Sequence, residues 1–515
     1  MKLPYLKEDG AKQQLTVQEF RGVDHRDPIG ANYFFDCKNL WSGEYPAAAV
    51  RPPRGTLPYE PLQKPHGLIW ADGLYWADGT GLYKDGVQVA ELSDSDKVMV
   101  RMGAYLCIWP DKVRYHTIDG TLERLEHSWS GKANITGSTI EAAGIGEGFA
   151  AYDGITITGA ATAGNNKTAV CLGAESGVLT FSDLCFEEET NVTLTLSRRV
   201  PDFDLLTELD NRLWGVTKDG HEIRACKLGD PKNWDCYEGL STDSYAVTVG
   251  SGGAFTGASS LQGYALLMKA EGVHKMYGTK PSNYQAITQK VRGPAAGAEK
   301  SLCELDEVLY YLSEDGVAAY LGGTPERIGL QLGSGRLLDA VGGGAGGRYY
   351  LSGQDGDGVW SLWCYDTSRQ LWYREDETRM LYAASGGGQL WYIDGRDNRL
   401  RTIVGEDAEE IPWMLETGDL TEGMPEHKHL VRVVLDIQLE ARSRCEVMIR
   451  YDEQEEWQTV HAFGSIGRRR IVQVPVVPIR YGRFRLRIEG TGRAKLWAVE
   501  RIVEGGTELG AQLQW

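Results

Sequence analysis

The segment His427-Lys428-His429 carries two imidazole side chains two residues apart, the pattern in this chain that comes closest to a metal-binding motif. Neutral imidazole is a common zinc ligand, but a zinc site takes three or four ligands from the chain. Glu426 is the obvious further ligand nearby. Because this set is too small, we predict a solvated segment at the start of a C-terminal domain, with no bound metal.

Paired carboxylates could cleave a glycosidic bond, because that reaction uses two acids about 5–10 Å apart on either side of the bond. Asp355 with Asp357, and Glu409 with Glu410, are such pairs in sequence, but sequence does not give the distance. Propeller sialidases also carry turns of the form Ser-x-Asp-x-Gly-x-x-Trp, an arginine triad and a Tyr–Glu pair. Residues 352–360 hold the turn's residue types in a shifted register. A glycan-binding or glycan-cleaving protein therefore stays an alternative.

Motifs of other enzyme classes are missing from the sequence. It has no GxSxG elbow, no P-loop, no HExxH and no Rossmann fingerprint. Arg468-Arg469-Arg470 is the one compact basic run, and in an acidic chain an exposed hairpin explains it better than a DNA contact. We predict that the chain is not an enzyme and has no catalytic, cofactor-binding or metal-ligating residues and no cofactor.

The elements that would position any site are short strands. The repeating unit is an apolar strand with Tyr or Trp, a turn centred on Gly or Asp, and a second strand. Its copies lie at residues 73–76, 104–108, 211–214, 264–267, 307–311, 347–350 and 389–392. Tyr310, Tyr349 and Trp391 are 39 and 42 residues apart, and a period of about 40 residues with about four strands is typical of propeller blades. This predicts an all-β fold with a propeller of about seven blades, in which the glycine-rich residues 342–347 form a blade-connecting turn.

Two breaks in the pattern predict further domains. Residues 127–203 are rich in Thr, Gly, Ala and Asn and read as a small β domain inserted into a propeller loop. Residues 413–515 alternate apolar and polar positions, as an antiparallel β-sandwich does. We therefore assign residues 1–126 to an N-terminal arm and the first blades, and 204–412 to the remaining blades.

Composition limits the partners of the chain. The net charge of −18 disfavours stable binding to nucleic acid. The 64 glycines among 515 residues suit many strands joined by tight turns. Nine scattered cysteines without a CxxC pair predict reduced thiols in a protein made in a cytosol. We expect no signal peptide at the N-terminus and no membrane insertion, because no segment approaches about 18 consecutive apolar residues.

Several segments, taken as an ordered set, resemble virion proteins of tailed phages. Phe20-Arg21-Gly22-Val23-Asp24, Cys37-Lys38-Asn39-Leu40, Glu44-Tyr45-Pro46 and Arg51-Pro52-Pro53-Arg54 resemble the opening of the tail nozzle and tail stabilisation proteins of short-tailed phages. Further segments resemble virion proteins of siphovirus-like prophages over nearly the whole chain: residues 200–204, 211–215, 228–234, 278–282 and 487–492.

The resemblance implies a structural tail component, in the form of a homo-oligomeric ring, nozzle or hub around the DNA path. Its partners would be other virion tail proteins, and genomic DNA would pass without specific binding. The protein would be made in the host bacterial cytoplasm and located in the virion. The resemblance transfers no catalytic residue. An unrelated cellular scaffold propeller remains a further alternative.

Overall fold

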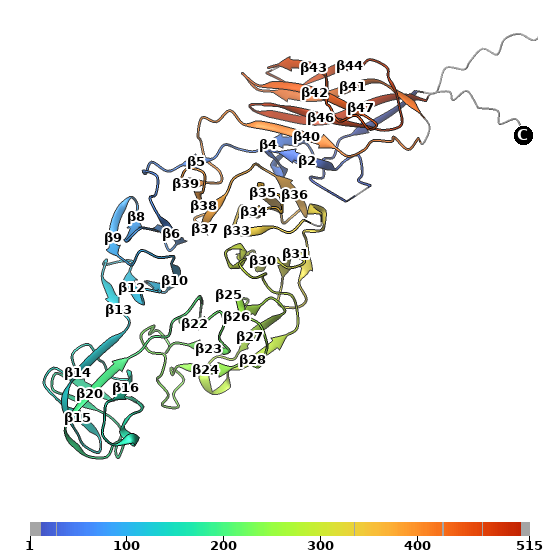
Figure 1. The fold of residues 1–515 in the computed structure, drawn as a ribbon. Coiled ribbons are helices and arrows are strands. Elements are labelled where there is room, and N and C mark those ends of the chain that lie inside the picture. The colour runs from blue at the N-terminus through green and yellow to red at the C-terminus, as the bar shows by residue number, and fades with distance from the viewer. Residues whose placement is uncertain (1–11, 27, 334, 425–426, 466, 506–515) are drawn as a thin grey trace, which may run out of the picture.

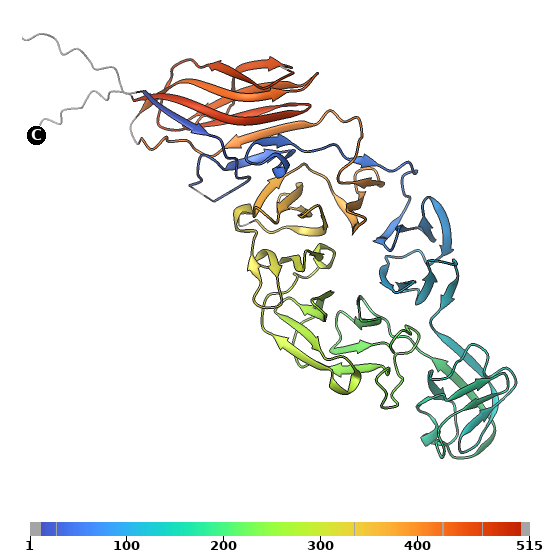
Figure 2. The ribbon, with the colours of Figure 1, turned by 180° about the vertical axis from the view of Figure 1, so that it is seen from behind.

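A computed structural model describes residues 12–26, 28–333, 335–424, 427–465 and 467–505. These residues form strands, joined by turns and by 3-10 helices of three residues each. None of the helices among them is long and apolar enough to cross a membrane. Figures 1 and 2 show three bodies in a row, with the propeller in the middle and a smaller β body at each end.

Seven four-stranded antiparallel sheets form the propeller, which confirms the prediction of an all-β propeller of about seven blades. Blades one to three are β6 (Pro65–Trp70), β7 (Leu74–Asp78), β8 (Gly81–Lys84) and β9 (Val87–Glu91); β10 (Val98–Met102), β11 (Tyr105–Trp109), β12 (Val113–His116) and β13 (Leu122–Arg124); and β21 (Leu205–Leu209), β22 (Arg212–Val216), β23 (Glu222–Ala225) and β24 (Tyr245–Thr248). Blades four and five are β25 (Phe255–Leu261), β26 (Tyr264–Lys269), β27 (Gly272–Tyr277) and β28 (Gln285–Gln289); and β29 (Cys303–Leu305), β30 (Val308–Ser313), β31 (Gly316–Tyr320) and β32 (Glu326–Arg327). Blades six and seven are β33 (Leu338–Ala345), β34 (Arg348–Gln354), β35 (Trp360–Asp366) and β36 (Leu371–Arg374); and β37 (Met380–Gly386), β38 (Gln389–Asp394), β39 (Arg399–Thr402) and β5 (Gly55–Thr56).

The seven copies of the sequence repeat all fall on the second strand of a blade: β7, β11, β22, β26, β30, β34 and β38. This strand packs against the neighbouring blades on both faces, so four of the five residues of β7 and five of the six of β30 are buried. A strand buried on both faces needs a continuous apolar run, which is why the signal was visible in the sequence.

The ring is closed by a strand from the N-terminal part of the chain. Thr56 and Gly55 of β5 pair with Arg401 and Thr402 of β39 and complete the seventh blade. The first and last segments of the propeller are thus held in one sheet, and the first strands of blades one and seven, β6 and β37, contact each other.

The inserted domain is a single seven-stranded sheet between blades two and three. It consists of β14 (His127–Ile135), β15 (Thr139–Glu141), β16 (Gly154–Thr158), β17 (Thr168–Val170), β18 (Gly173–Glu175), β19 (Val178–Thr180) and β20 (Glu189–Arg198). β14 and β20 pair from His127↔Arg198 onward and form the stem by which the chain leaves and re-enters the propeller. The domain has its own core, in which Ile140, Ile155 and Leu194 are fully buried.

The Asp153 side chain connects the inserted domain to blade three through Asn233. The Asp153 carboxylate lies 2.5 Å from Arg198 Nη1 and accepts a hydrogen bond of 2.9 Å from Asn233 Nδ2. Asn233 lies in the segment 228–234, and Trp234 of the same segment is fully buried with its indole N–H on the Pro231 carbonyl. This turn therefore anchors both the next strand and the inserted domain.

The C-terminal sandwich contains strands from both ends of the chain. One sheet holds β1 (Lys12–Val17), β3 (Leu40–Trp41), β4 (Ala48–Val50), β41 (Lys428–Leu439), β44 (Arg470–Pro475), β45 (Arg480–Tyr481) and β47 (Ala494–Gly505). The other holds β2 (Phe34–Lys38), β40 (Pro412–Thr417), β42 (Arg444–Tyr451), β43 (Gln458–Gly464) and β46 (Phe484–Thr491).

The N-terminal arm therefore differs from its assignment by sequence. The sequence assigns residues 1–126 to an N-terminal arm and the first blades, whereas β1 to β4 of this arm pair within the sandwich and the first blade begins at Pro65. Lys12 lies opposite Glu504, and Phe34 lies opposite Thr417. Partners nearly 400 or more residues away leave no local pattern in the sequence, so the association could not be read from it. Residues 506–515 of the assigned sandwich, and residues 1–11 of the arm, lie outside the described residues.

A buried ionic cluster, formed by Arg51, Arg54, Glu375 and Asp376, joins the sandwich to the propeller. The Arg54 Nη2 atom lies 2.9 Å from Glu375 Oε2 and 3.0 Å from Asp376 Oδ2, while Arg51 Nη2 lies 3.5 Å from Asp376 Oδ2. Arg54 also donates to the hydroxyl of Thr378 and, over 3.2 Å, to that of Tyr392 in β38. The cluster thus connects the N-terminal segment with blades six and seven.

Asn39 connects the same cluster to the sandwich. Arg51 Nε donates to Asn39 Oδ1 over 2.8 Å, and Asn39 Nδ2 donates to the Pro412 carbonyl, where β40 begins, over 2.7 Å. Asn39 adopts φ +54°, a left-handed backbone that asparagine tolerates better than most residues. Asn39, Arg51 and Arg54 of the N-terminal segment therefore build the joint between two bodies.

The glycine-rich residues 342–347 differ from the prediction of a blade-connecting turn. Gly342, Gly343 and Gly344 lie inside β33, and Gly346 and Gly347 form the β33–β34 turn within blade six at φ +57° and +69°. A Cβ on Gly343 would lie 2.3 Å from a methyl carbon of Leu390 in blade seven. Glycine is needed here because neighbouring blades come close together at the centre of the ring.

Candidate functional site: the mouth of the central channel

The first strands of neighbouring blades contact one another and surround the propeller axis. They enclose a cavity of about 530 Å³, which is lined from all seven blades and includes Leu68, Val98, Leu205, Ala258, Leu302, Val341 and Ala383. A second cavity of about 390 Å³ adjoins it and shares Asp96, Glu299 and Lys300. Both volumes are typical of ligand sites, about 300–1,000 Å³. We call the region of these three residues the channel mouth.

The side chains of the mouth come from the beginnings of inner strands. Asp96 precedes β10, Asp339 is the second residue of β33, and Arg379 directly precedes β37, which carries Tyr382. The 3-10 helix η4 (Glu299–Ser301) leads into β29. Because the inner strands run in the same direction around the axis, their first residues meet on one face of the ring.

His66 is held between two carboxylates at the edge of the mouth. Its Nε2 lies 2.8 Å from Asp94 Oδ1, and its Nδ1 lies 3.0 Å from Asp96 Oδ1. Partial burial lowers the pKa of His66, but the hydrogen bonds to Asp96 and Asp94 outweigh it and raise the pKa above the ordinary value. Burial raises the pKa of Asp96, but its hydrogen bonds with His66 and Tyr382 and the nearby charge of Lys300 outweigh burial and lower this pKa below its ordinary value.

Two of the lysines that line the channel are paired. Lys218 Nζ lies 2.7 Å from Glu299 Oε1, and Lys97 Nζ lies 2.6 Å from Asp111 Oδ2. Burial raises the pKa of Glu299, but the hydrogen bond from Lys218 lowers it below its ordinary value. Both Asp96 and Glu299 are therefore ionised at neutral pH.

Two cations at the mouth lack a carboxylate partner. Among the described residues, neither Lys300 nor Arg379 makes a side-chain hydrogen bond or ion pair. Lys300 Nζ lies 3.8 Å from the centre of the Tyr382 ring, and the Arg379 guanidinium lies 5.0 Å from that of Trp360. Burial lowers the pKa of Lys300, and the negative charge of the nearby Asp96 offsets this lowering in part. The mouth thus presents two positive groups held by aromatic rings.

Glycosidic cleavage needs one carboxylic acid that stays protonated near neutral pH beside one ionised carboxylate. Asp96 and Glu299 both have lowered pKa values. Neither acid is therefore held protonated near neutral pH, as the general acid of such a reaction would be.

A serine–histidine pair occurs in blade four, away from the mouth. Ser251 Oγ lies 2.8 Å from His274 Nε2, and His274 Nδ1 lies 2.9 Å from Thr288 Oγ1. Burial and the nearby Lys269 lower the pKa of His274 to about 4. A serine nucleophile needs a histidine that gains a proton in the transition state, usually with a carboxylate behind it. Here a threonine stands in that place and a cation lies nearby, so the pair fixes the loop before β25.

The residues selected by sequence lie in three different places. Lys428 of the His427-Lys428-His429 segment is fully buried and donates to the carbonyls of Met424 and Gly482. Among the described residues, no group of three His, Cys, Asp or Glu side chains could hold a metal. Glu426, the candidate for a further ligand beside the two histidines, lies outside the described residues.

Asp355 caps the β34–β35 turn, because its Oδ1 accepts from the backbone N–H groups of Asp357 and Val359, both over 2.9 Å. The Ser352 hydroxyl, at the start of the same 352–360 segment, donates to the Thr378 carbonyl over 2.8 Å. The segment therefore acts as a structural turn, and of the residues named here only Trp360, at its end, lines the channel mouth.

The remaining candidates belong to the joint and to the sandwich. Glu409 lies 3.2 Å from Arg51, whereas Glu410 is exposed. Arg469 pairs with Asp436 at 2.6 Å, and Arg468 and Arg470 are exposed. None of these acids and arginines lines the channel mouth.

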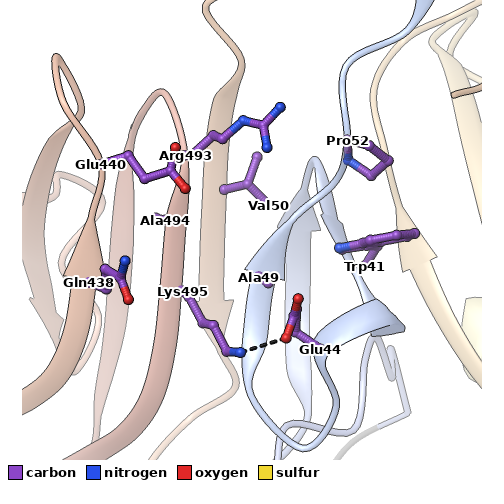
Figure 3. Close-up of a pocket in the computed structure, with 10 residues that line it drawn as sticks. All are labelled: Trp41, Glu44, Ala49, Val50, Pro52, Gln438, Glu440, Arg493, Ala494 and Lys495. Atoms are coloured by element: carbon purple, nitrogen blue, oxygen red, sulfur yellow. Dashed lines mark hydrogen bonds and ion pairs between the residues drawn. The ribbon is translucent and has the colours of Figure 1, made fainter. Parts of the chain in front are cut away.

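A smaller pocket of about 190 Å³ lies on the sandwich, between β3–β4 and β41–β47 (Figure 3). Ala49, Val50 and Ala494 line it, and an ion pair of 2.5 Å between Lys495 and Glu44 crosses one side. Its volume is below the usual range of ligand sites. Of its two cations, Lys495 is already paired, whereas Arg493 makes no side-chain hydrogen bond or ion pair among the described residues.

Sequence reasoning missed the residues of the mouth. Asp96, Lys300 and Tyr382 lie in blades two, five and seven, and each is an isolated residue in an ordinary loop or strand. The signal that could have found them is positional: they stand at or just before the first strand of a blade, a place that becomes recognisable once blade boundaries are known.

The sequence matches no family model and no curated protein sequence. Similar solved structures include a phage phi92 endosialidase, which is 10% identical with a TM-score of 0.28 and covers 76% of this chain and 75% of that one. A β-propeller domain of Nup133 from Vanderwaltozyma polyspora is 10% identical with a TM-score of 0.24, over 71% and 99% of the two chains. An exo-β-1,3-galactanase from Phanerochaete chrysosporium is 10% identical with a TM-score of 0.21, over 58% and 95%. At such scores the likeness carries no functional argument, and the fold rests on the sheet topology itself.

Proposed function

We propose that this chain is a structural protein of a tailed-phage or prophage virion, and that several copies form a ring, nozzle or hub around the DNA path of the tail. The protein is made in the host cytoplasm, joins other tail proteins during assembly and has no enzymatic activity or cofactor. This is the role implied by the resemblance of its N-terminal segments.

The observation that carries the proposal is the buried joint. The segments that resemble phage tail proteins contribute Asn39, Arg51 and Arg54, and these three side chains tie the sandwich to blades six and seven. The same hydrophobic core continues from the sandwich into blades five to seven. A part that transmits force between neighbours in an assembly needs such a rigid connection, whereas a separate binding module on a linker does not.

The shape of the molecule supports contacts with more than one neighbour. The inserted domain and the sandwich lie at opposite ends of the propeller (Figures 1 and 2). Contacts between unlike ends of identical chains generate closed rings when the rotation closes. A channel cavity of about 530 Å³ is of the size for a small ligand. DNA would therefore pass through the ring of copies and not through one propeller.

The experiment that tests this proposal is the composition of intact particles. Particles from phage-producing cells that encode the chain would be purified on a density gradient, treated with nuclease and salt, and analysed by quantitative mass spectrometry and cryo-electron microscopy. We expect a fixed number of copies per particle and ring density that fits the propeller. Recovery of the chain only from the cell lysate, or as one unattached copy per particle, would contradict the proposal.

A second candidate function, glycan binding for host adsorption, is favoured by one observation. The mouth of the channel holds two cations without carboxylate partners, Lys300 and Arg379, beside a cavity of ligand size.

A further inference from the structure

We propose that the channel mouth is a binding site for a saccharide that carries a carboxylate, such as a uronic or sialic acid unit. This inference goes beyond the structural role and does not depend on it, because binding is measured on the isolated chain.

The carboxylate would pair with Lys300 and Arg379. Both line the cavity of about 390 Å³, and among the described residues neither makes a hydrogen bond or ion pair with a carboxylate, although the nearby Asp96 partly offsets the lowering of the Lys300 pKa by burial. The Tyr382 ring under Lys300 and the Trp360 ring under Arg379 hold the two charges in place before a ligand arrives. Such preorganisation removes part of the ordering cost of binding.

The hydroxyl groups of a sugar would find acceptors beside these cations. Asp339 lines the same cavity, is exposed, and makes no side-chain hydrogen bond or ion pair among the described residues. Its backbone adopts φ +49° at the β-bulge of β33 between Leu338 and Val341. An ionised carboxylate accepts two hydroxyl hydrogen bonds readily, so Asp339 complements a polyol.

The charge balance of the mouth selects a monoanion over a phosphate. Asp96, Glu299 and Asp339 are three acids that line the cavity, and the lowered pKa values of Asp96 and Glu299 keep these two ionised. A carboxylate brings one negative charge for two cations. A phosphate ester brings nearly two, and its second charge would be repelled by the acids.

The cavity also sets the size of the ligand. Its volume of about 390 Å³ lies in the lower part of the range of ligand pockets, and the adjoining cavity of about 530 Å³ is lined in part by apolar side chains such as Leu68, Val98 and Leu205. A short saccharide end therefore fits the mouth with its charged group at Lys300 and Arg379.

The test uses the full chain and titration calorimetry, with saturation-transfer NMR for weak ligands. The probes are the methyl glycosides of glucuronic acid and N-acetylneuraminic acid, with methyl glucoside as the neutral match and glucose 6-phosphate as the phosphate match. We expect at least one acidic sugar to bind at least tenfold more tightly than methyl glucoside and glucose 6-phosphate, with an affinity that falls as salt rises.

Variants distinguish binding at the channel mouth from nonspecific attraction to charge on the protein surface. Lys300→Ala and Arg379→Ala should each weaken binding at least tenfold, and Lys300→Arg should retain most of it. Lys290→Ala is the control, because it removes one exposed lysine that does not line the cavity and changes the net charge equally. The thermal unfolding of each variant checks that it is folded.

The proposal is overturned by any of three results. These are the absence of binding by both acidic sugars, equal or tighter binding of glucose 6-phosphate, and unchanged binding in folded Lys300→Ala and Arg379→Ala. None of these binding measurements uses particles. A negative binding result would therefore not contradict the virion role, and absence of the chain from particles would not contradict the binding site.

Discussion

Replacement of Arg54 by methionine should destabilise the joint between sandwich and propeller. The Arg54 side chain is 5% exposed and its guanidinium contacts Glu375 and Asp376, which are 3% and 11% exposed. Methionine preserves much of the side-chain volume but removes the charge. The variant therefore leaves two buried carboxylates with Arg51 as their remaining close cation, at 3.7 Å and 3.5 Å.

The magnitude follows from the burial of the cluster. Removal of one partner of a buried ion pair costs about 3–5 kcal/mol, because the other partner stays buried without compensation. Unfolding entropy is about 2.1 cal/mol/K per residue, so a cooperative unit of roughly 400 residues loses about 1 °C for each kcal/mol. We expect a fall in Tm of about 4–6 °C.

Scanning calorimetry on the full chain measures this change, with Arg101→Met as the control. Arg101 pairs with Asp72 through side chains that are 43% and 73% exposed, and an exposed pair contributes at most about 1 kcal/mol. A second variant, Glu375→Gln, and the double variant with Arg54→Met complete a double-mutant cycle. Because the two side chains are in contact, the double variant should lose less than the sum of the single losses.

The pKa of Asp376 gives the same joint a dependence on pH. Burial raises this pKa, but Arg54 and Arg51 together lower it to about 2, below the ordinary 3.8. The contribution of Asp376 to stability is thus present above about pH 4 and is lost as the pH falls towards 2.

The prediction for the joint is refuted if Arg54→Met unfolds within about 1 °C of the wild type, or if the stability losses of Arg54→Met and Glu375→Gln simply add in the double variant.

Three further predictions concern the propeller mouth, DNA and catalysis. Because the pKa of His66 is raised, its pairing with Asp94 and Asp96 stabilises the fold below about pH 6.5, and this stabilisation is lost as the pH rises through the folded pKa. The difference in Tm between wild type and His66→Gln should therefore shrink from about pH 5.5 to about pH 8.5. A constant difference would contradict the ion pairing. With a net charge of −18, the chain should not shift duplex DNA in a gel at about 0.15 M salt. Weak binding at low salt should vanish when Arg468, Arg469 and Arg470 are replaced by glutamines. A shift at submicromolar protein and physiological salt would instead indicate a protein that binds the genome stably. Fluorogenic sialosides and other common glycosides should not be hydrolysed, and a turnover that is lost in Asp96→Asn or in Glu299→Gln would show that the mouth is catalytic.

Sequence reasoning succeeded where the physical constraint on a residue is local. Each second strand of a blade is buried on both faces, so it carries a continuous apolar run with an aromatic residue, as in Leu74–Asp78 and Val308–Ser313. The long strand Lys428–Leu439 has one buried and one partly exposed face, so its apolar residues alternate. These patterns are properties of a few consecutive residues, and they were sufficient for the blade count and for the strands of the two other bodies.

Sequence reasoning failed where a residue depends on a distant partner. The glycines of residues 342–344 look like a turn in isolation, but they lie in β33 and pair with β34. Distant residues occupy the space of a Cβ at each of them: Ser301 at Gly342, Leu390 at Gly343 and Cys303 at Gly344. Asp96, Lys300 and Tyr382 are unremarkable in their own segments, and they become a candidate site only where three blades meet.

The sequence by itself thus predicted about seven repeated β units with an interruption near residue 127 and a sandwich from about residue 412, because burial imposes a period on each strand. The tertiary structure decided which strands pair. It placed β1 to β4 in the sandwich and β5 in the seventh blade, and it brought Arg51 and Arg54 to Glu375 and Asp376. A strand's own residues specify that it is extended and which face is buried. Its partner is chosen by the closure of the ring and the packing of the joint, which involve residues more than 300 positions apart.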